Sequence, residues 1–579
     1  MRVAINSFTT TSGTDASLNE STETNTSNGL FYGTVAGVPR PFREPGISVL
    51  EPALPAGTRE CSTSGQTDCV PVWDANPELL EIDSKSFGGT PLNVTSETNL
   101  TGLTGVMDFS SGAPEILLDR TSTPTVSGGL QAVPVPVPVP VPATPSGDFT
   151  VASFNMERFY NATADADNPG SSVVVVTPEA YQRRLNKASL AIRNVLNFPD
   201  VIGTQEIENL QVLTDLANKI SADAVSAGQA DPQYLPYLFL ATDGTGINTG
   251  MLVKSTRVTA VSAEQFGLNT TFTNSTGAQA TLNDRTPLVL HLGIKRGSGL
   301  PDYPITVICV HQRSLIDVDD TTSTGATVRL KREAQAEYLA KLIQDYQAAG
   351  EKVITVGDYN SFQFSDGYVD VLGVTKGSPV PADTVITPPA AGLVNPPLTD
   401  LVTLLPPEQQ QSYVESGSAQ VLDHVVVTSN LLPSYVNLVY AHIDSDFPLV
   451  DQNDASTPYR VSDHDPAVAY FTIPPMAINV NLKVTETLSK VAGGFQEIVT
   501  IQNTGTTTAQ GVQLTSAVLG SANGTPIPQA LGDVAQGSSV TATVMFSSAA
   551  GASGTRSVAS ITGTYTGGTF TSSARVVLP

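Results

Sequence analysis

The chain is poor in cysteine, in charged residues and in aromatic residues. Of its 579 residues, 14% are charged and 6% are aromatic, and there are three cysteines and one tryptophan. Three cysteines are too few to hold a fold of this length together by disulfides. No stretch approaches the ~18 consecutive apolar residues that a membrane-spanning helix needs. We therefore expect a globular chain without a membrane span.

The three cysteines occur in two settings. Cys61 and Cys69 enclose a short polar loop and would pair in an oxidising compartment, and the sequence leaves their pairing open. Cys309 lies in the apolar run Ile-Thr-Val-Ile-Cys-Val. This run predicts that Cys309 is a buried strand residue with a structural role.

Positive charge is also scarce, since 29 Lys and Arg face 54 Asp and Glu and the net charge is −25. Residues 148–475 carry −17 of this charge, residues 1–147 carry −9 and residues 476–579 carry +1. Nonspecific affinity for nucleic acid comes from Lys and Arg that displace counterions from phosphates, so the charge argues against a broad nucleic-acid-binding face. It does not exclude a nucleic-acid substrate, because bound cations and a few arginines can offset the field locally.

The length predicts two to four domains, and 47 Gly and 41 Pro favour strands and loops over long helices. Residues 1–28 are polar and predict a flexible arm, whereas residues 29–125 contain short β-type runs that predict a small β domain, OB-like or irregular. Alternating valine and proline from Val133 to Pro142 predicts a polyproline II spacer inside a linker over residues 126–147.

Residues 148–475 alternate predicted strands with predicted helices, which indicates an α/β domain. The expected strands cover residues 149–154, 199–204, 287–292, 305–310, 353–356, 422–427 and 467–471, and the expected helices cover residues 179–197 and 329–347. Residues 476–579 show short alternating strands with Gly-rich turns, which predict an immunoglobulin-like β-sandwich with an accessory role.

Acidic, amide and imidazole side chains follow one another at the ends of these predicted strands. They are Asn155, Glu206, His311, Asp358, Asn360, Asp423, His424, Asp463 and His464. Strand ends are where an α/β sheet usually presents its ligand-binding groups. Carboxylates and amides bind hard divalent cations, and a histidine beside an aspartate can carry a proton. Together these residues predict metal-assisted hydrolysis of phosphate esters.

Each motif alone has a simpler explanation. An Asp-x-Asn sequence after a strand, such as Asp358 and Asn360, is commonly a turn former. A strand-end glutamate is usually solvated, an Asp-His pair is often a local hydrogen bond, and Asn155 would serve as a loop cap. The prediction of catalysis therefore depends on the joint order of the motifs.

That order resembles the endonuclease/exonuclease/phosphatase superfamily, which includes pancreatic-type DNases, abasic-site endonucleases, sphingomyelinases and inositol polyphosphate phosphatases. The matching motifs are Phe-Asn155, Gln-Glu206, Gly-Asp358-Tyr-Asn360, Asp423-His and Ser-Asp463-His464, within about residues 148–473. The wider segments Tyr-Gln-Arg-Arg-Leu-Asn-Lys-Ala and Tyr459-Arg460-Val-Ser-Asp463-His464 are closest to secreted bacterial nucleases of this superfamily.

The resemblance implies a four-layer α/β/β/α sandwich with its active site at one edge of the two sheets. It implies that Glu206 is the principal ligand of Mg²⁺ or Mn²⁺, with Asn155 and Asp463 beside it. His464, oriented by Asp423 or Asp463, would activate the attacking water or stabilise the pentavalent phosphorus.

The resemblance also assigns roles to the remaining polar residues. Asp358 and Asn360 would position the nucleophile and the phosphate oxygens. His311 would bind phosphate or protonate the leaving oxygen, and Arg285 matches an arginine that contacts phosphate.

Some parts of the sequence depart from the family pattern. Where bacterial relatives often have Asn-His-Leu-Lys-Ser-Lys, this chain has Val-His311-Gln-Arg313-Ser-Leu, so Arg313 keeps the positive charge for substrate binding while its neighbours differ. We expect a structural hydrogen bond rather than chemistry for His424. The loops over residues 165–168 and 317–320 are rich in aspartate and are candidates for a structural Ca²⁺ site, although neither has an EF-hand register.

We therefore predict a divalent-metal-dependent phosphodiesterase, an extracellular DNA or RNA endonuclease of low sequence specificity. The alternatives are an enzyme of the same fold acting on nucleotides, phospholipid head groups or other small esters, and a non-catalytic surface-binding protein.

The start of the chain lacks the apolar core of a signal peptide, whereas the Ser, Thr, Asn and Gly content of the chain is typical of secreted bacterial proteins. We expect secretion with the signal peptide absent from this sequence, and no obligate protein partner.

Overall fold

The computed structural model describes residues 1–48, 61, 69–110, 113–130, 149–164, 173–241, 245–296, 300–475 and 479–579. The chain divides into two compact units. The first contains Met1–Lys295 and Asp302–Ile473, and the second contains Arg296–Pro301 and Pro474–Pro579. Within the described part of the chain, no helix is both long enough and apolar enough to cross a bilayer.

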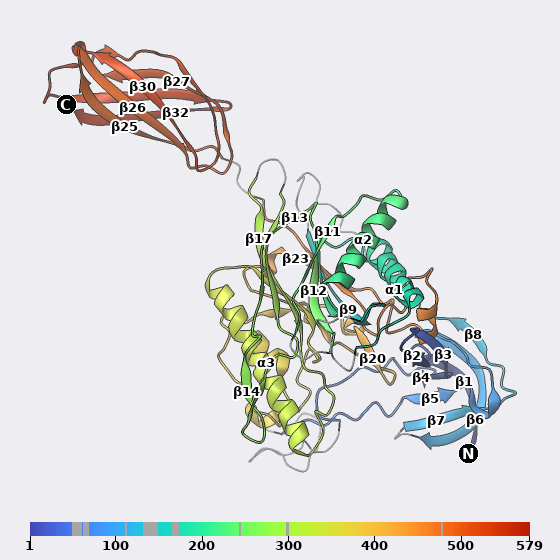
Figure 1. Ribbon diagram of the computed structural model, residues 1–579. Coiled ribbons are helices and arrows are strands. Elements are labelled where there is room, and N and C mark those ends of the chain that lie inside the picture. The colour runs from blue at the N-terminus through green and yellow to red at the C-terminus, as the bar shows by residue number, and fades with distance from the viewer. Residues whose placement is uncertain are drawn as a thin grey trace. The chain divides into compact units, whose positions relative to one another are not determined.

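The N-terminal part of the first unit is a β-barrel (Figure 1). Its strands run in the order β1-β4-β5-β7-β6-β8, and β1 also pairs with β6, which closes five strands into a ring. They are β1 (Arg2–Thr10), β4 (Leu30–Val35), β5 (Leu80–Asp83), β6 (Thr98–Ser110), β7 (Ala113–Leu118) and β8 (Thr125–Gly128), beside the hairpin β2 (Ala16–Asn19) and β3 (Thr24–Ser27). The closed order supports the OB-like form of the prediction, which stays a prediction.

The predicted flexible arm over residues 1–28 is wrong. Strand β1 pairs with β4 and β6, and Phe8 is fully buried in the barrel core. The polar composition led to this wrong prediction because alternate residues of β1 face solvent. A strand of this kind needs only a few apolar side chains for its buried face. The predicted linker also began too early, because residues 125–128 form β8. Residues 131–147 of that linker lie outside the described residues.

Two six-stranded sheets form the centre of the first unit. One has the order β11-β12-β10-β9-β24-β23, with β9 (Phe149–Phe159), β10 (Val201–Ile207), β11 (Tyr234–Leu238), β12 (Asn248–Lys254), β23 (Tyr435–Tyr440) and β24 (Ala467–Phe471). The other has the order β13-β16-β17-β18-β22-β19, with β13 (Val258–Gln265), β16 (Leu288–Ile294), β17 (Tyr303–His311), β18 (Val353–Asp358), β19 (Thr399–Asp400) and β22 (Asp423–Val427). Two separate hairpins, β14 (Thr271–Thr273) with β15 (Gln279–Thr281) and β20 (Tyr413–Glu415) with β21 (Ser418–Gln420), lie in sequence between strands of the second sheet.

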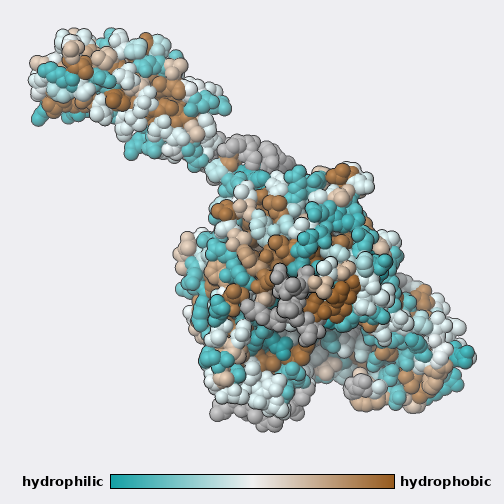
Figure 2. Space-filling model, viewed as in Figure 1, coloured by the Kyte–Doolittle hydropathy of each residue, from teal (hydrophilic) through white to brown (hydrophobic). Residues whose placement is uncertain are grey.

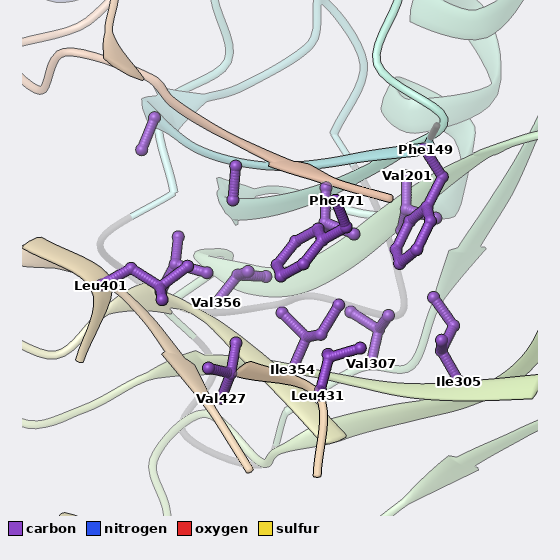
Figure 3. Packing of buried hydrophobic residues seen from close by; sticks show 14 of the residues in the cluster. Phe149, Val201, Ile305, Val307, Ile354, Val356, Leu401, Val427, Leu431 and Phe471 are labelled. Carbon is purple, nitrogen blue, oxygen red and sulfur yellow. The ribbon is translucent and has the colours of Figure 1, made fainter. Parts of the chain in front are cut away.

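The two sheets pack face to face through buried aliphatic and aromatic side chains. Figure 3 shows Phe149, Val201 and Phe471 of the first sheet against Ile354 and Val356 of the second. Phe149 and Phe471 stack with ring centroids 5.1 Å apart. Cys309 is buried in the same cluster, which confirms its prediction as a buried strand residue.

Helices cover the outer face of each sheet, which gives four layers (Figure 1). α1 (Pro178–Leu190), continued by a π-helical turn over Ala191–Val195, and α2 (Leu210–Ser226) pack on the first sheet. α3 (Ser323–Ala348) and α4 (Val371–Lys376) pack on the second. The α/β prediction is confirmed, although the sequence pattern did not predict α2 or the strands β11, β12, β13 and β23.

The second unit consists of β-strands around one apolar cluster. Its sheets contain β25 (Leu482–Val491), β26 (Gly494–Asn503) and β30 (Ser539–Ser547), and β27 (Ala509–Leu519), β28 (Ala522–Asn523), β29 (Gln529–Val534), β31 (Arg556–Tyr565) and β32 (Gly568–Val577). Its visible surface mixes hydrophilic and hydrophobic residues (Figure 2), as expected where only one face of each sheet packs inward. Its immunoglobulin-like character stays a prediction.

Polar contacts join the N-terminal barrel to the central sheets within the first unit. Arg40 pairs with Asp446 at 2.5 Å, and the Asn76 amide donates to the Ser418 hydroxyl at 2.8 Å. The Cys61–Cys69 disulfide, which the sequence left open, is formed.

Candidate active site

Strand register brings three of the predicted residues into one row across the second sheet. His311 at the end of β17 is the partner of Asp358 in the parallel β18, and Asp358 is the partner of Asp423 in the antiparallel β22. Gly357 approaches β17 so closely that an added Cβ would lie 2.0 Å from the Val310 carbonyl oxygen. Glycine is therefore required immediately before Asp358.

The first sheet presents Asn155 and Glu206 from its neighbouring strands β9 and β10. The pairing of β10 shifts register between Gln205 and Ile207, and Glu206 has a φ of 62°, so a bulge redirects its side chain. The Asn155 amide donates to Glu206 Oε1 at 3.4 Å and to Asp358 Oδ2 at 3.2 Å. This amide links the two sheets at the site.

His464 lies immediately before β24 and is held by a carboxylate of the opposite sheet. Its Nδ1 donates to Asp423 Oδ2 at 2.7 Å, and the Ser412 hydroxyl donates to the same oxygen at 2.8 Å. Its Nε2 lies 3.9 Å from both Asp358 Oδ2 and Asp463 Oδ1. Of the two orienting aspartates considered from sequence, Asp423 is therefore the hydrogen-bonded one.

His311, Asp358, Glu206, Asp463 and His464 line one cleft of about 650 Å³. Arg158, Arg285 and Arg313 line it together with the acids and histidines. Arg158 follows Asn155 on β9, and its backbone N–H donates to Glu206 Oε2 at 2.8 Å. These arginines place cationic groups among the carboxylates of the cleft.

Asn360 lies beside Asp358 in a turn with a φ of 47°. Its backbone N–H donates to Asp358 Oδ1 at 2.7 Å, and its side-chain amide donates to Asp358 Oδ2 at 3.0 Å. The turn-forming role considered from sequence is thus present, and it places the Asn360 amide on the cleft wall. A non-glycine residue in the left-handed region stores strain of the kind that clusters at functional sites.

Opposite pKa shifts separate the two histidines of the cleft. Burial opposes charge on His464, but the neighbouring carboxylates, first that of Asp423, raise its pKa well above the usual range. Burial lowers the pKa of His311 well below its usual range, and the positive charge of Arg285 adds to this effect. His464 is therefore the histidine that gains a proton in this environment.

The carboxylates of the cleft carry more negative charge than the protein compensates. Burial and the charge of Asp463 raise the pKa of Glu206, and burial raises the pKa of Asp358 although His464 opposes it. Oxygen donors with excess negative charge are what a divalent cation binds. The residues present therefore fit a bound Mg²⁺ or Mn²⁺, with Glu206, Asn155 and Asp463 as its candidate ligands.

His424 lies outside this arrangement. Its Nδ1 donates to Asp400 Oδ2 at 2.9 Å, and its Nε2 lies 2.8 Å from the Ser361 carbonyl oxygen. Both ring nitrogens are thus used within the protein interior. The prediction of a structural hydrogen bond for His424 is confirmed.

The candidate calcium loops gain no support. Residues 165–168 lie outside the described residues. In the other loop, Asp320 Oδ1 accepts the backbone N–H of Thr322, which caps α3. Among the described residues, the two side-chain groups close enough to hold a metal ion are Asp358, Asp423 and His464, and His442, Asp446 and Asp465. The calcium site stays a prediction.

Helix α1 supports the site from behind through the Arg-Arg-Leu-Asn-Lys segment. Arg184 donates to the carbonyl oxygens of Met156 and Glu157, which follow Asn155, and pairs with Glu23 of the N-terminal hairpin at 3.2 Å. Lys187 donates through Nζ to the carbonyl oxygens of Asp451, Asp454 and Thr457, in the connection that leads to His464. The sequence analysis identified this segment only by its similarity to bacterial nucleases, and the contacts in the folded protein show its supporting role.

The buried Lys187 should make the stability of the protein depend on alkaline pH. Its side chain has 0% exposure, and burial lowers its pKa from 10.5 to about 8. Between these pH values the unfolded chain holds a proton that the folded chain releases, so the contribution of Lys187 to stability rises with pH. From pH 7.5 to 10.5, the free energy of unfolding of wild type relative to Lys187→Met should rise by roughly 3 kcal/mol.

Urea unfolding at several pH values measures this difference. The matched control is Lys341→Met, because the exposed ammonium group of Lys341 pairs with Glu337 on the helix surface at 2.9 Å. A pH dependence that is identical in wild type and Lys187→Met would contradict the assignment.

Several residues of the site were not predicted from sequence. Arg158, Ser412 and Tyr413 belong to no strand-end motif, yet Tyr413 packs on His464 with ring centroids 4.8 Å apart and the rings tilted by 50°. Trp73 and Arg43 of the N-terminal region also line the cleft. The sequence motifs gave neither Trp73 nor Arg43 a role.

Comparisons with known proteins agree with this fold. The model of the Endonuclease/Exonuclease/phosphatase family matches residues 152–464. No curated protein matches the chain.

Solved structures with similar chains include an endonuclease/exonuclease/phosphatase family protein from Bacteroides thetaiotaomicron, with 15% identity and a TM-score of 0.32 over 56% of this chain and 95% of that chain. An AP endonuclease from Archaeoglobus fulgidus has 14% identity and a TM-score of 0.32 over 56% of this chain and 99% of that chain. Beta toxin from Staphylococcus aureus has 13% identity and a TM-score of 0.32 over 55% of this chain and 99% of that chain.

Proposed function

Because the chain belongs to the endonuclease/exonuclease/phosphatase family, we propose that it is a divalent-metal-dependent phosphodiesterase and that its substrate is DNA or RNA, cleaved with low sequence specificity. The observation that carries this proposal is the Asp423–His464 pair, which faces Asp358 and Glu206 across one cleft. These residues offer a proton acceptor and an anionic site for a cation, and arginines line the same cleft.

The bound cation would supply charge neutralisation at the phosphate, and Glu206, Asn155 and Asp463 would hold it. A cation bound beside these carboxylates would offset the negative charge that raises the pKa of His464. His464 Nε2 would then accept the proton of the attacking water while Asp423 holds Nδ1 and stabilises the imidazolium. Asp358 and the Asn360 amide would orient the water and the phosphate oxygens. Arg285 and Arg313 would bind the phosphate, since guanidinium groups match its geometry.

His311 is suited to hydrogen bonding with phosphate. Because its pKa is lowered, the ring is neutral at neutral pH, and one of its nitrogens donates. Its Nε2 lies 3.6 Å from Asp358 Oδ2 and 3.8 Å from Glu206 Oε1. We assign it to the leaving oxygen or a nonbridging phosphate oxygen.

Parallel assays of supercoiled plasmid, RNA and bis(p-nitrophenyl) phosphate, with Mg²⁺, Mn²⁺ or EDTA, test the proposed substrate class. Metal-dependent nicking of plasmid supports the nuclease. Turnover of the small ester with intact plasmid and RNA would instead assign a phosphodiesterase or phosphatase acting on small esters, the alternative that the acidic surface favours.

Asp423→Asn should move the pH profile of the reaction. A general base is active when deprotonated, so the rate falls as pH drops through the pKa of His464. The neutral amide removes the attraction that raises this pKa, so the acid limb of the kcat profile should shift to lower pH by about one unit or more. The kcat should also fall, because an amide that donates to Nδ1 leaves Nε2 protonated.

The matched control is Asp400→Asn, in the buried Asp400–His424 pair outside the cleft. Asp400→Asn should leave the acid limb of the kcat profile at the same pH as in wild type. An unmoved limb in Asp423→Asn would remove His464 from the role of base.

We also propose an extracellular location. The Cys61–Cys69 disulfide supports it, because disulfides persist in oxidising compartments. Fractionation of the source cells, with the protein detected by antibody, tests this proposal. Recovery only from the reducing interior would contradict it.

A further inference from the structure

One wall of the cleft comes from the N-terminal region and not from the central sheets. Arg43, Ser48 and Trp73 line the cleft together with the reacting groups. Trp73 is half-buried, and it is the one tryptophan of the chain. The reactions assigned above use none of these residues.

The indole of Trp73 is held in a fixed orientation. Its Nε1 donates to Asn76 Oδ1 at 3.4 Å, and the backbone N–H of Trp73 donates to the Ile47 carbonyl oxygen at 2.9 Å. The Asn76 amide in turn donates to Ser418 on the hairpin that carries Tyr413. The N-terminal wall is thus tied to the element that packs on His464.

Arg43 supports the indole from behind. Its guanidinium carbon lies 4.1 Å from the Trp73 ring centroid and 4.8 Å from that of Phe362. Arg43 is only 8% exposed, and it donates to the Gly46 carbonyl oxygen at 2.5 Å. The guanidinium is therefore occupied as a stacking partner of the aromatic wall.

We propose that Trp73, backed by Arg43 and Phe362, forms a stacking subsite for a nucleobase of the substrate. This inference rests on the proposed phosphodiesterase function and names a source of substrate affinity. An acidic chain gains little from a broad phosphate footprint, so local stacking has to contribute. Stacking tolerates every base, since each has an aromatic face, and this agrees with low sequence specificity.

The single tryptophan gives a direct measurement of binding. The His464→Ala variant with Mg²⁺ should bind a five-residue oligothymidylate without cleaving it. The oligothymidylate should quench the Trp73 fluorescence saturably, whereas an oligomer with the same phosphates and no bases should not. Equal quenching by both oligomers would overturn the proposal.

Kinetics give a second, independent test. Trp73→Ala should raise the KM for oligothymidylate roughly tenfold and leave kcat unchanged, because base stacking contributes binding energy away from the reacting bond. The KM for the base-free oligomer should stay the same, and Trp73→Phe should restore most of the affinity. Phe109→Ala is the control, an aromatic side chain that is 70% exposed on the barrel strand β6.

The outcomes separate this inference from the proposed function. If wild type cleaves neither oligomer with Mg²⁺ or Mn²⁺, the proposed nuclease function fails. If wild type cleaves both, and Trp73→Ala raises both KM values equally or neither, only the stacking subsite fails. The fluorescence measurement keeps the tryptophan in place, so it remains decisive if Trp73→Ala does not fold.

Discussion

His464→Ala should lower kcat for phosphodiester hydrolysis by about 10²- to 10⁴-fold, the usual contribution of a positioned general acid or base. The imidazole is placed for this role by the 2.7 Å hydrogen bond from Nδ1 to Asp423, which leaves Nε2 directed toward Asp358. Alanine removes the proton acceptor and leaves the arginines and the candidate cation ligands in place. The KM should therefore change far less than kcat.

The matched control for this loss is His291→Ala. His291 is a half-buried histidine of β16 that also pairs with an acid, Glu351, at 3.2 Å, but it does not line the cleft. Steady-state turnover of bis(p-nitrophenyl) phosphate by the two variants and wild type measures the effect. Equal kcat values in His464→Ala and wild type would exclude His464 from the reaction.

Glu206→Gln should lower the activity by about a hundredfold or more, because it keeps the shape of the side chain and removes the charge that holds the cation. Glu206 lies on a bulge with a left-handed backbone, and its two oxygens accept from the Asn155 amide and the Arg158 backbone N–H. The glutamine side chain has one acceptor oxygen in place of two, so it can keep only one of these two hydrogen bonds at its original position. The half-saturating concentration of Mg²⁺ should therefore rise together with the fall in kcat.

Titration of Mn²⁺ by calorimetry measures the loss of cation binding independently of turnover. Glu179→Gln, on the exposed first turn of α1, is the control that removes one negative charge elsewhere. If Glu206→Gln bound Mn²⁺ as wild type does, Glu206 would not be a metal ligand.

The strand-end motifs could be read from sequence because their geometry follows from the backbone. His311, Asp358 and Asp423 each end or begin a buried apolar run, and neighbouring strands in register place such positions side by side. The apolar runs were also correct for Cys309 and for β24, whose predicted bounds match the structure. Local periodicity is sufficient for these features.

Other features depend on contacts between segments far apart in sequence. Nothing local distinguishes Asp423 from Asp463 as the partner of His464, and only the packing of β22 against the connection before β24 decides it. The N-terminal residues looked like a mobile arm because a barrel strand with one solvated face is half polar. Trp73 lies far in sequence from the other residues of the cleft, so no local pattern predicted its contribution to the cleft.

The most direct test of the central claim is the incubation of wild-type protein with supercoiled plasmid, in Mg²⁺ and in EDTA. The account predicts conversion to nicked circles in Mg²⁺, none in EDTA, and none with His464→Ala in Mg²⁺. Plasmid, RNA and bis(p-nitrophenyl) phosphate that all remain intact with Mg²⁺ or Mn²⁺ would contradict it and favour a non-catalytic surface-binding protein.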